Sequence, residues 1–315
     1  MSPAAALESE IFRFYAATIL GLLVLAGLVL LIVRWRARAA ADHAWRAYLG
    51  WLVIVPAVLG AIFLGRLATI ALLTLVALAG FKEFARATGL YRDWLMTSVV
   101  YAGIVAIGIV CAVDDPTLLT PGWYGLFVAL PAFVIAAILM VPIVRNRATG
   151  QLQLMALAIV GFVYIGWMFG HLTFLVNARN AYGYLLFLVF AVALNDVAAF
   201  TFGRLFGRRP LRSSISPHKT WEGACGALAV SMVLPWALWF SLPDFTPREL
   251  ILTGLIVGIG GQLGDLSISV IKRDIGIKDT GALLRGHGGI LDRIDSLIYT
   301  APLFFHMAGY FHDMQ

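Results

Sequence analysis

The sequence predicts an all-α, polytopic integral membrane protein with about nine or ten transmembrane helices. Hydrophobic residues make up 61% of the 315 positions, only 13% are charged, and the mean hydropathy is +0.89. Soluble globular chains are about 45–50% apolar and about 25% charged. A water-soluble core of this size could not bury so much apolar surface, so we expect lipid to surround most of the chain.

Ten apolar segments approach the roughly 20 residues that a membrane-spanning helix needs. The first 180 residues are expected to form an N-terminal transmembrane scaffold, whereas unusual polar residues gather in 181–315. Within the scaffold, the arginines of residues 34–47, with Trp35 and Trp45, predict a short basic amphipathic helix at the membrane interface. The ten segments are centred on 14–33, 48–65, 67–81, 96–113, 124–144, 153–176, 182–203, 222–242, 248–270 and 295–311.

The basic residues predict how the chain is oriented in the membrane. If the N-terminus lies outside and the segments alternate, 19 of the 23 lysine and arginine residues fall on inward-facing connections. By the positive-inside rule, this bias places both termini outside and the most polar connections in the cytoplasm. The net charge of +6 is spread among apolar segments. We therefore expect contact with lipid headgroups and phosphate ligands, and no nucleic-acid partner.

Two carboxylates lie inside predicted spans, where ionisable side chains are costly and indicate a functional site. Asp196 follows Asn195 in the seventh span, and Asp265 ends the glycine-rich run Gly-Ile-Gly-Gly-Gln-Leu-Gly-Asp in the ninth. The glycines would let a neighbouring backbone or a ligand come close. Asp265, Ser269 and Lys272 are spaced i, i+4 and i+7, so we expect them on one helical face. A buried ion pair between helices is the alternative interpretation of Asp265.

The connection from Lys272 to Asp295 mixes acids, bases and glycines more densely than any other part of the chain. Carboxylates hold Mg²⁺ through hard oxygen ligands, and Lys and Arg neutralise phosphate oxygens. Glycines let backbone N–H groups approach anions. Asp292 and Asp295, spaced i and i+3, would share a helical face at the start of the tenth span. This connection therefore predicts a metal–polyphosphate site.

The segment Ser-Pro-His-Lys-Thr-Trp-Glu-Gly at 216–223 predicts the beginning of a helix. Ser216 would be the N-cap and Pro217 the first helical residue. The free N–H groups and the positive dipole at such a position can hold an anion. Lys219 would lie in the first turn, where a cation opposes the dipole, which indicates that an anion normally binds there. A plain helix start is the alternative.

The familiar nucleotide-hydrolase and protease motifs are missing from the sequence. No segment matches G-x-x-x-x-G-K-S/T, H-E-x-x-H or G-x-S-x-G, and nothing marks a serine or cysteine nucleophile. The polar residues therefore predict metal-assisted direct transfer, in which two anions are brought together and their charge is neutralised.

Residues 269–295 read S-V-I-K-R-D-I-G-I-K-D-T-G-A-L-L-R-G-H-G-G-I-L-D-R-I-D. This segment resembles the signature of the phosphatidate cytidylyltransferase (CDP-diacylglycerol synthase) family at every fixed position except Arg285, where that family usually has Pro or Gly. The segment 216–223 and the run from Asp196 to Gly207 are similar to the family as well. The N-terminal half is similar only in being hydrophobic.

The resemblance implies a magnesium-dependent CTP:phosphatidate cytidylyltransferase of phospholipid biosynthesis, with 181–315 as its catalytic region. Its substrates would be CTP and phosphatidic acid, its products CDP-diacylglycerol and pyrophosphate, and its cofactor Mg²⁺, with a monovalent cation such as K⁺ as a further candidate. The family resemblance also implies a homodimer. The compact chain fits a bacterial inner membrane, and the distribution of basic residues places the active site on the cytoplasmic side.

The resemblance also assigns roles to individual residues. Asp265 and Asp292 would be the principal metal ligands, with Asp196 and Asp295 in or near the same shell. Lys219, Lys272, Arg273 and Lys278 would bind the triphosphate and the lipid phosphate, and of these Lys219 and Lys272 would be catalytic together with Asp265 and Asp292. Ligands or loops would be oriented by Ser216, Ser269, Asp279, His287 and Arg293.

Three other functions compete with this interpretation. A different membrane lipid transferase is one, although Ala199 stands where the N-D-x-x-D motif of intramembrane prenyltransferases needs its second Asp. An ion-coupled transporter that uses Asp196 and Asp265 is another, but it would place functional residues near the bilayer midplane. A non-catalytic family member is the third, and the intact acids argue against it. Arg285 leaves a variant lipid phosphate as an alternative acceptor.

Overall fold

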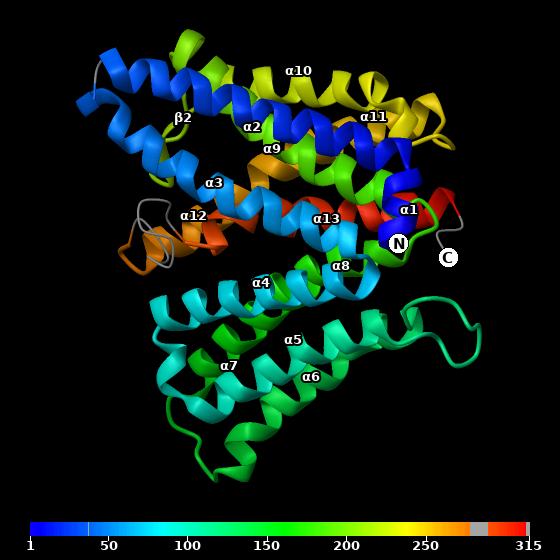
Figure 1. Ribbon diagram of the computed structural model, residues 1–315. Helices are drawn as coiled ribbons and strands as arrows, with labels where there is room; N and C mark the ends of the chain where they lie inside the picture. The colour runs from blue at the N-terminus through cyan, green and yellow to red at the C-terminus, as the bar shows by residue number, and fades with distance from the viewer. Residues whose placement is uncertain (37, 278–288, 313–315) are drawn as a thin grey trace.

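The computed structural model describes residues 1–36, 38–277 and 289–312, which form a bundle of helices with one small β-hairpin (Figure 1). The first half comprises α1 (Pro3–Glu8), α2 (Glu10–Arg36), α3 (Arg38–Leu64), α4 (Arg66–Ala87), η1 (Leu90–Arg92), α5 (Trp94–Ala112), α6 (Tyr124–Val144), α7 (Gln151–Val160), η2 (Gly161–Met168), α8 (Phe169–Phe174) and η3 (Leu175–Asn177). The second half comprises α9 (Ala181–Phe206), β1 (Pro210–Arg212), β2 (Ser216–Thr220), α10 (Trp221–Ala237), η4 (Trp239–Ser241), α11 (Pro247–Leu255), η5 (Ile256–Gly260), α12 (Gly261–Asp274) and α13 (Leu291–Phe311).

The helices confirm the predicted all-α, polytopic membrane fold. Within the described residues, eight helical segments are long and apolar enough to cross a membrane, and each corresponds to a predicted span. The two remaining predicted spans, 222–242 and 295–311, are also helical, but their helices are not both long enough and apolar enough to be counted as membrane-spanning. The helix α10 has only 17 residues, and α13 carries three charged residues in its first two turns.

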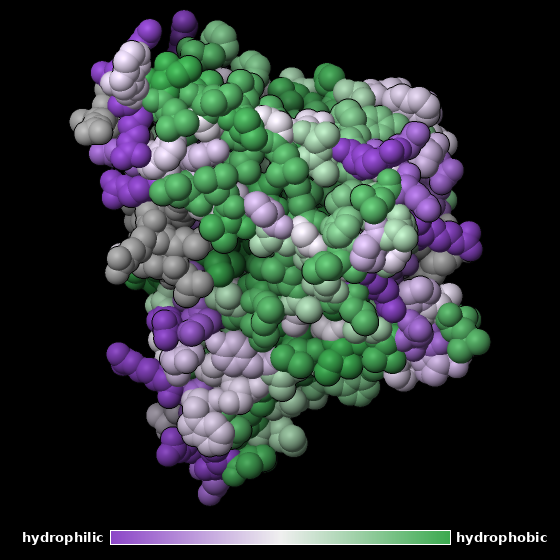
Figure 2. Space-filling view, in the orientation of Figure 1, coloured by the Kyte–Doolittle hydropathy of each residue, from purple (hydrophilic) through white to green (hydrophobic). Residues whose placement is uncertain are grey.

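The polar connections gather at the two ends of the bundle, and an apolar band separates them (Figure 2). All five connections that were predicted to face inward lie at one end, on the left in Figure 1, in so far as the structure describes them. The N-terminus and the end of α13 lie at the opposite end. The basic residues are therefore segregated in space as well as in sequence, as the alternating topology requires.

The basic segment 34–47 does not form the separate interfacial helix that was expected. Arg34 and Arg36 end α2, and α3 begins at Arg38 and continues without a break to Leu64. An ion pair of 3.7 Å joins Arg34 to Asp42, and the Arg34 guanidinium lies 5.0 Å from the centre of the Trp45 ring. The described residues of this segment are thus the end of α2 and the beginning of α3, because both apolar helices extend into it.

The glycines of the ninth predicted span allow close packing where the polar residues gather. At Gly264, a Cβ atom would collide with the carbonyl oxygen of Asp295 and would lie 2.8 Å from Cα of Ser296. Only glycine therefore lets α12 and α13 cross at this point. The π-helical segment η5 directly precedes α12, and such irregular turns are frequent at functional sites. Both features fix the position of Asp265, which follows Gly264.

Candidate active site

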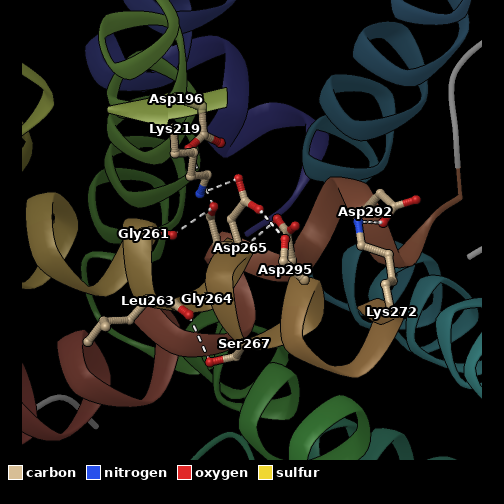
Figure 3. Close-up of polar contacts among 12 residues, drawn as sticks. Asp196, Lys219, Gly261, Leu263, Gly264, Asp265, Ser267, Lys272, Asp292 and Asp295 are labelled. Atoms are coloured by element: carbon tan, nitrogen blue, oxygen red, sulfur yellow. Dashed lines mark hydrogen bonds and ion pairs between the residues drawn. The ribbon is translucent and has the colours of Figure 1, made fainter. Parts of the chain in front are cut away.

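Three carboxylates from three helices converge at the basic end of the bundle (Figure 3). Asp196 comes from α9, Asp265 from α12 and Asp295 from the first turns of α13. The side chain of Asp295 is buried and accepts a 2.7 Å hydrogen bond from the backbone N–H of Ser296. The Ser296 hydroxyl lies 3.4 Å from Asp196 Oδ1 and 3.1 Å from the Gly261 carbonyl oxygen, so it links all three helices.

Lys219 supplies the cation closest to these carboxylates. Its Nζ atom lies 2.6 Å from Asp265 Oδ2, and the Ser269 hydroxyl donates a 3.2 Å hydrogen bond to Asp265 Oδ1. Asp265 and Ser269 therefore share a helical face, as their spacing predicted. The third member of the predicted column, Lys272, pairs instead with an aspartate of the next helix.

Lys272 and Asp292 form a second ion pair, between α12 and α13. The distance from Lys272 Nζ to Asp292 Oδ1 is 2.8 Å, and the side chains are 13% and 14% exposed. The backbone N–H of Gly289 donates a 3.1 Å hydrogen bond to Asp292 Oδ2. Both carboxylate oxygens of Asp292 thus have partners, and the pair joins α12 to the first turn of α13.

A cavity of about 320 Å³ lies between α9, α10, α12 and the β-hairpin. Three residues predicted for the site, Asp196, Lys219 and Asp265, line its wall. The sequence had not singled out its other polar lining residues: Arg204, His218, Thr220 and Gln262. The volume is that of a small-molecule site, and the wall carries both acids and bases.

The helix start predicted at Ser216 is wrong, because residues 216–220 form strand β2. This strand pairs with β1 in an antiparallel hairpin, and Ser216 lies opposite Arg212. The N-cap of α10 is Thr220, whose hydroxyl accepts a 3.1 Å hydrogen bond from the Gly223 N–H. The preference of Ser216 and Pro217 for a helix start is outweighed here by hydrogen bonding between β2 and β1, the strand that follows α9. Lys219 therefore reaches the site from a hairpin, and Ser216 does not line the cavity.

Other residues predicted for the site lie apart from the cavity or outside the described residues. The Arg273 side chain donates a 3.1 Å hydrogen bond to the Ile215 carbonyl and so ties α12 to the hairpin. Arg293 is exposed, and its guanidinium lies 5.8 Å from the centre of the Trp51 ring on α3. The predictions for Lys278, Asp279, Arg285 and His287 fall outside the described residues.

The sequence interpretation missed Glu83 of α4, which is only 5% exposed. Its Oε2 atom accepts a 3.0 Å hydrogen bond from the backbone N–H of Leu291, the first residue of α13. The third span was predicted to end at residue 81, which placed Glu83 in a connection. The signal that could have found it is an acid within an apolar helix.

The carboxylates fit a divalent metal in their chemistry but do not form a compact metal site. Among residues 1–36, 38–277 and 289–312, no group of three or more His, Cys, Asp or Glu side chains is arranged to hold a metal ion. Asp196, Asp265 and Asp295 offer hard oxygen ligands of the kind that Mg²⁺ prefers. Lys219 is the one ammonium that Figure 3 shows beside these three carboxylates, so negative charge is in excess.

The fold and the site define a polytopic helical membrane protein with an acidic and basic pocket at one end. The chain matches the cytidylyltransferase family over residues 45–311, and it belongs to that family. Membership places it among the membrane nucleotidyltransferases, and it favours a transferase over the transporter that the sequence left open.

Curated relatives are similar over different parts of the chain. It is 31% identical over 303 residues to the uncharacterized protein YnbB of Escherichia coli K12, covering 93% of this chain and 97% of that protein. It is 40% identical over 161 residues to the phosphatidate cytidylyltransferases of Staphylococcus haemolyticus and Staphylococcus aureus COL. Those matches cover half of this chain and 60% of each staphylococcal enzyme.

Proposed function

We propose that this protein transfers CMP from CTP to phosphatidic acid, or to a related lipid phosphate, in phospholipid biosynthesis. A phosphate oxygen of the lipid attacks the α-phosphorus of CTP, the bond to the β-phosphate oxygen breaks, and pyrophosphate leaves. The products are CDP-diacylglycerol and pyrophosphate. The observation that carries the proposal is the charged cavity of a cytidylyltransferase-family protein, with Lys219 and Asp265 paired in its wall.

Both substrates are anions, so the site has to hold negative charges side by side. Lys219 lines the cavity and can exchange its Asp265 partner for a phosphate oxygen. The exposed Arg204 of α9 lines the same cavity and adds a second positive charge. Neutralising the triphosphate and aligning the lipid phosphate with it would lower the barrier by positioning and charge stabilisation.

The cavity also borders the apolar surface that would face lipid. Phe200 lines it, and this side chain is 68% exposed. Its neighbour Val197 is 59% exposed. A lipid phosphate could therefore reach the cavity from the membrane while its acyl chains stay in the bilayer, which supports a lipid acceptor over a soluble one.

We propose Mg²⁺ as the cofactor, held by Asp265 together with Asp196 and Asp295, with Asp292 as a further ligand. The bound cation, with K⁺ as a candidate second ion, would supply positive charge to the phosphate oxygens. The chain's own contribution is to keep these carboxylates at the meeting point of α9, α12 and α13. We also propose a bacterial inner-membrane location, both termini outside, the pocket facing the cytoplasm, and a homodimer.

A single assay tests the proposal. Purified protein in detergent, supplied with Mg²⁺, labelled CTP and phosphatidic acid, should release pyrophosphate and form a labelled CDP-lipid in equal amounts. Omitting the lipid or adding excess chelator should stop both signals. Failure with phosphatidic acid and with every other lipid phosphate tried would refute the proposal, whereas activity with a different lipid phosphate alone would redefine the acceptor.

A further inference from the structure

Glu83 is the buried acid that the proposed reaction does not yet use. One carboxylate oxygen, Oε2, accepts the 3.0 Å hydrogen bond from the Leu291 N–H. The other, Oε1, is buried and has no hydrogen-bond partner among the described residues. A buried acceptor without a partner costs about 1–3 kcal/mol, and more when it is charged. The stability of the fold alone therefore does not explain why a carboxylate is buried at position 83.

The beginning of α13 needs an acceptor that the local sequence does not supply. The first N–H groups of a helix have no partners within the helix. The N-cap position of α13 is Ile290, whose side chain cannot accept a hydrogen bond. Asp292 is in the first turn, but its Oδ1 binds Lys272 and its Oδ2 binds the Gly289 N–H. Glu83 takes the place of the missing cap from a helix 208 residues earlier.

Packing beside Glu83 holds the same two helices together. At Gly80, one turn before Glu83, an added Cβ would lie 3.4 Å from Cδ1 of Ile294 and 3.9 Å from Cδ1 of Leu291. These are ordinary van der Waals distances, so α4 packs directly against the first turn of α13 beside the Glu83–Leu291 hydrogen bond. The acidic group also lies at the N-terminus of α13, where a negative charge interacts favourably with the helix dipole.

We propose that Glu83 is a positioning residue of the active site. By fixing the first turn of α13, it sets the place and the rotation of Asp292 and Asp295. This inference rests on the proposed function for its kinetic consequences, but not for the contact itself. It assigns a role in the reaction to the N-terminal half of the chain, which the sequence had treated only as a scaffold.

The test compares two substitutions of similar size with a matched control. Glu83→Gln keeps a carbonyl oxygen that can accept from Leu291, whereas Glu83→Met does not. Gln151→Met is the control, because Gln151 is also buried, also has a side-chain oxygen without a partner among the described residues, and is the first residue of α7. For each variant, kcat, KM for CTP, and amide hydrogen exchange of residues 289–295 are measured on the full-length protein.

Glu83→Met should lower kcat by about tenfold or more, the usual effect of losing a supporting hydrogen bond behind a reactive group, with KM for CTP within about twofold. Hydrogen exchange at 289–295 should become faster. Glu83→Gln and Gln151→Met should stay within about fivefold of the original kcat and should leave the exchange unchanged. A Glu83→Met loss below about fivefold, or an equal loss in either of the other variants, would overturn the inference.

The exchange measurement keeps this inference separate from the proposed function. If the unmodified protein turns over no lipid phosphate, the proposed function fails, while hydrogen exchange still tests the Glu83 contact. Equal exchange at 289–295 in the unmodified protein and in Glu83→Met would then overturn the positioning role, and faster exchange in Glu83→Met alone would support it.

Discussion

Two lysine–aspartate pairs at the basic end of the bundle have similar distances but different surroundings. The Lys219–Asp265 pair joins the β-hairpin to α12 at 2.6 Å, and its side chains are 21% and 36% exposed. The Lys272–Asp292 pair joins α12 to α13 at 2.8 Å, and its side chains are 13% and 14% exposed. Lys219 and Asp265 both line the cavity, whereas neither Lys272 nor Asp292 does.

The difference in exposure suggests that the two pairs have different roles. A partly solvated ion pair contributes little to stability and can be opened by a ligand. Removing one member of a more buried pair destabilises the folded protein, because the remaining charge is then buried without that partner. We therefore expect Lys219–Asp265 to exchange partners with substrate, and Lys272–Asp292 to hold α12 and α13 together.

Replacing Asp265 by Asn should have the largest effect on activity. The variant keeps the size of the side chain but loses the charge that the proposed metal needs, so turnover should fall by at least about a hundredfold. The apparent melting temperature should stay near that of the original protein, because this pair is partly exposed. The check is pyrophosphate release beside a thermal unfolding curve; a variant that keeps its activity would remove Asp265 from the site.

Breaking the second pair should affect stability as well as turnover. Either Lys272→Met or Asp292→Leu alone should destabilise the protein by about 2 kcal/mol, because each removes one partner of a largely buried ion pair. The double variant should recover most of that loss without recovering activity. Thermal unfolding of the two single variants and the double variant measures the coupling. Additive losses would show that the pair does not hold the helices together.

The smallest effect is expected at a structural pair in the N-terminal half. Arg145 Nη1 lies 2.7 Å and 2.6 Å from the two carboxylate oxygens of Asp93. Partial burial acts to raise the pKa of Asp93, but hydrogen bonds from Arg145 and from the Met96 N–H outweigh it, so the pKa lies below the ordinary 3.8. Asp93→Asn should cost about 1 kcal/mol at neutral pH and leave turnover unchanged.

The sign of the pH dependence follows from the lowered pKa. The folded state holds the Asp93 proton more weakly than the unfolded state does, so the stabilisation is complete above the ordinary pKa of 3.8. It is lost as the pH falls through the lower folded-state pKa. Unfolding curves of the original protein and of Asp93→Asn should therefore differ at pH 7 and converge in acid. A constant difference down to pH 2 would contradict the assignment.

The sequence predicted the membrane helices well because length and hydropathy decide them. Each of the ten predicted segments is helical within the described residues. The shared face of Asp265 and Ser269 was confirmed, since it depends on helical spacing alone. The close approach of another backbone at the glycines was confirmed as well, at Gly264. The pairing of Lys272 with Asp292 was not predicted, because it depends on how two helices cross.

The errors arose where tertiary contacts override local preference. Ser216 and Pro217 have the chemistry of a helix start, yet β1 offers the chain a strand partner. Residues 34–47 have the composition of an interfacial helix, yet two long helices run into them. The partner of Glu83 was missed because the only hydrogen bond of its side chain among the described residues is to a residue 208 positions away. No local pattern can reveal such a partner.

The Glu83–Leu291 contact also has a consequence for how the protein folds while the ribosome is synthesising it. At about 5–20 residues per second, the 208 residues between the two partners take roughly 10–40 s to synthesise. During that interval α4 is already made while the helix that its carboxylate caps does not yet exist. The carboxylate must meanwhile be hydrated, so we expect the newly made bundle to stay open to water at this end until α13 arrives and closes it.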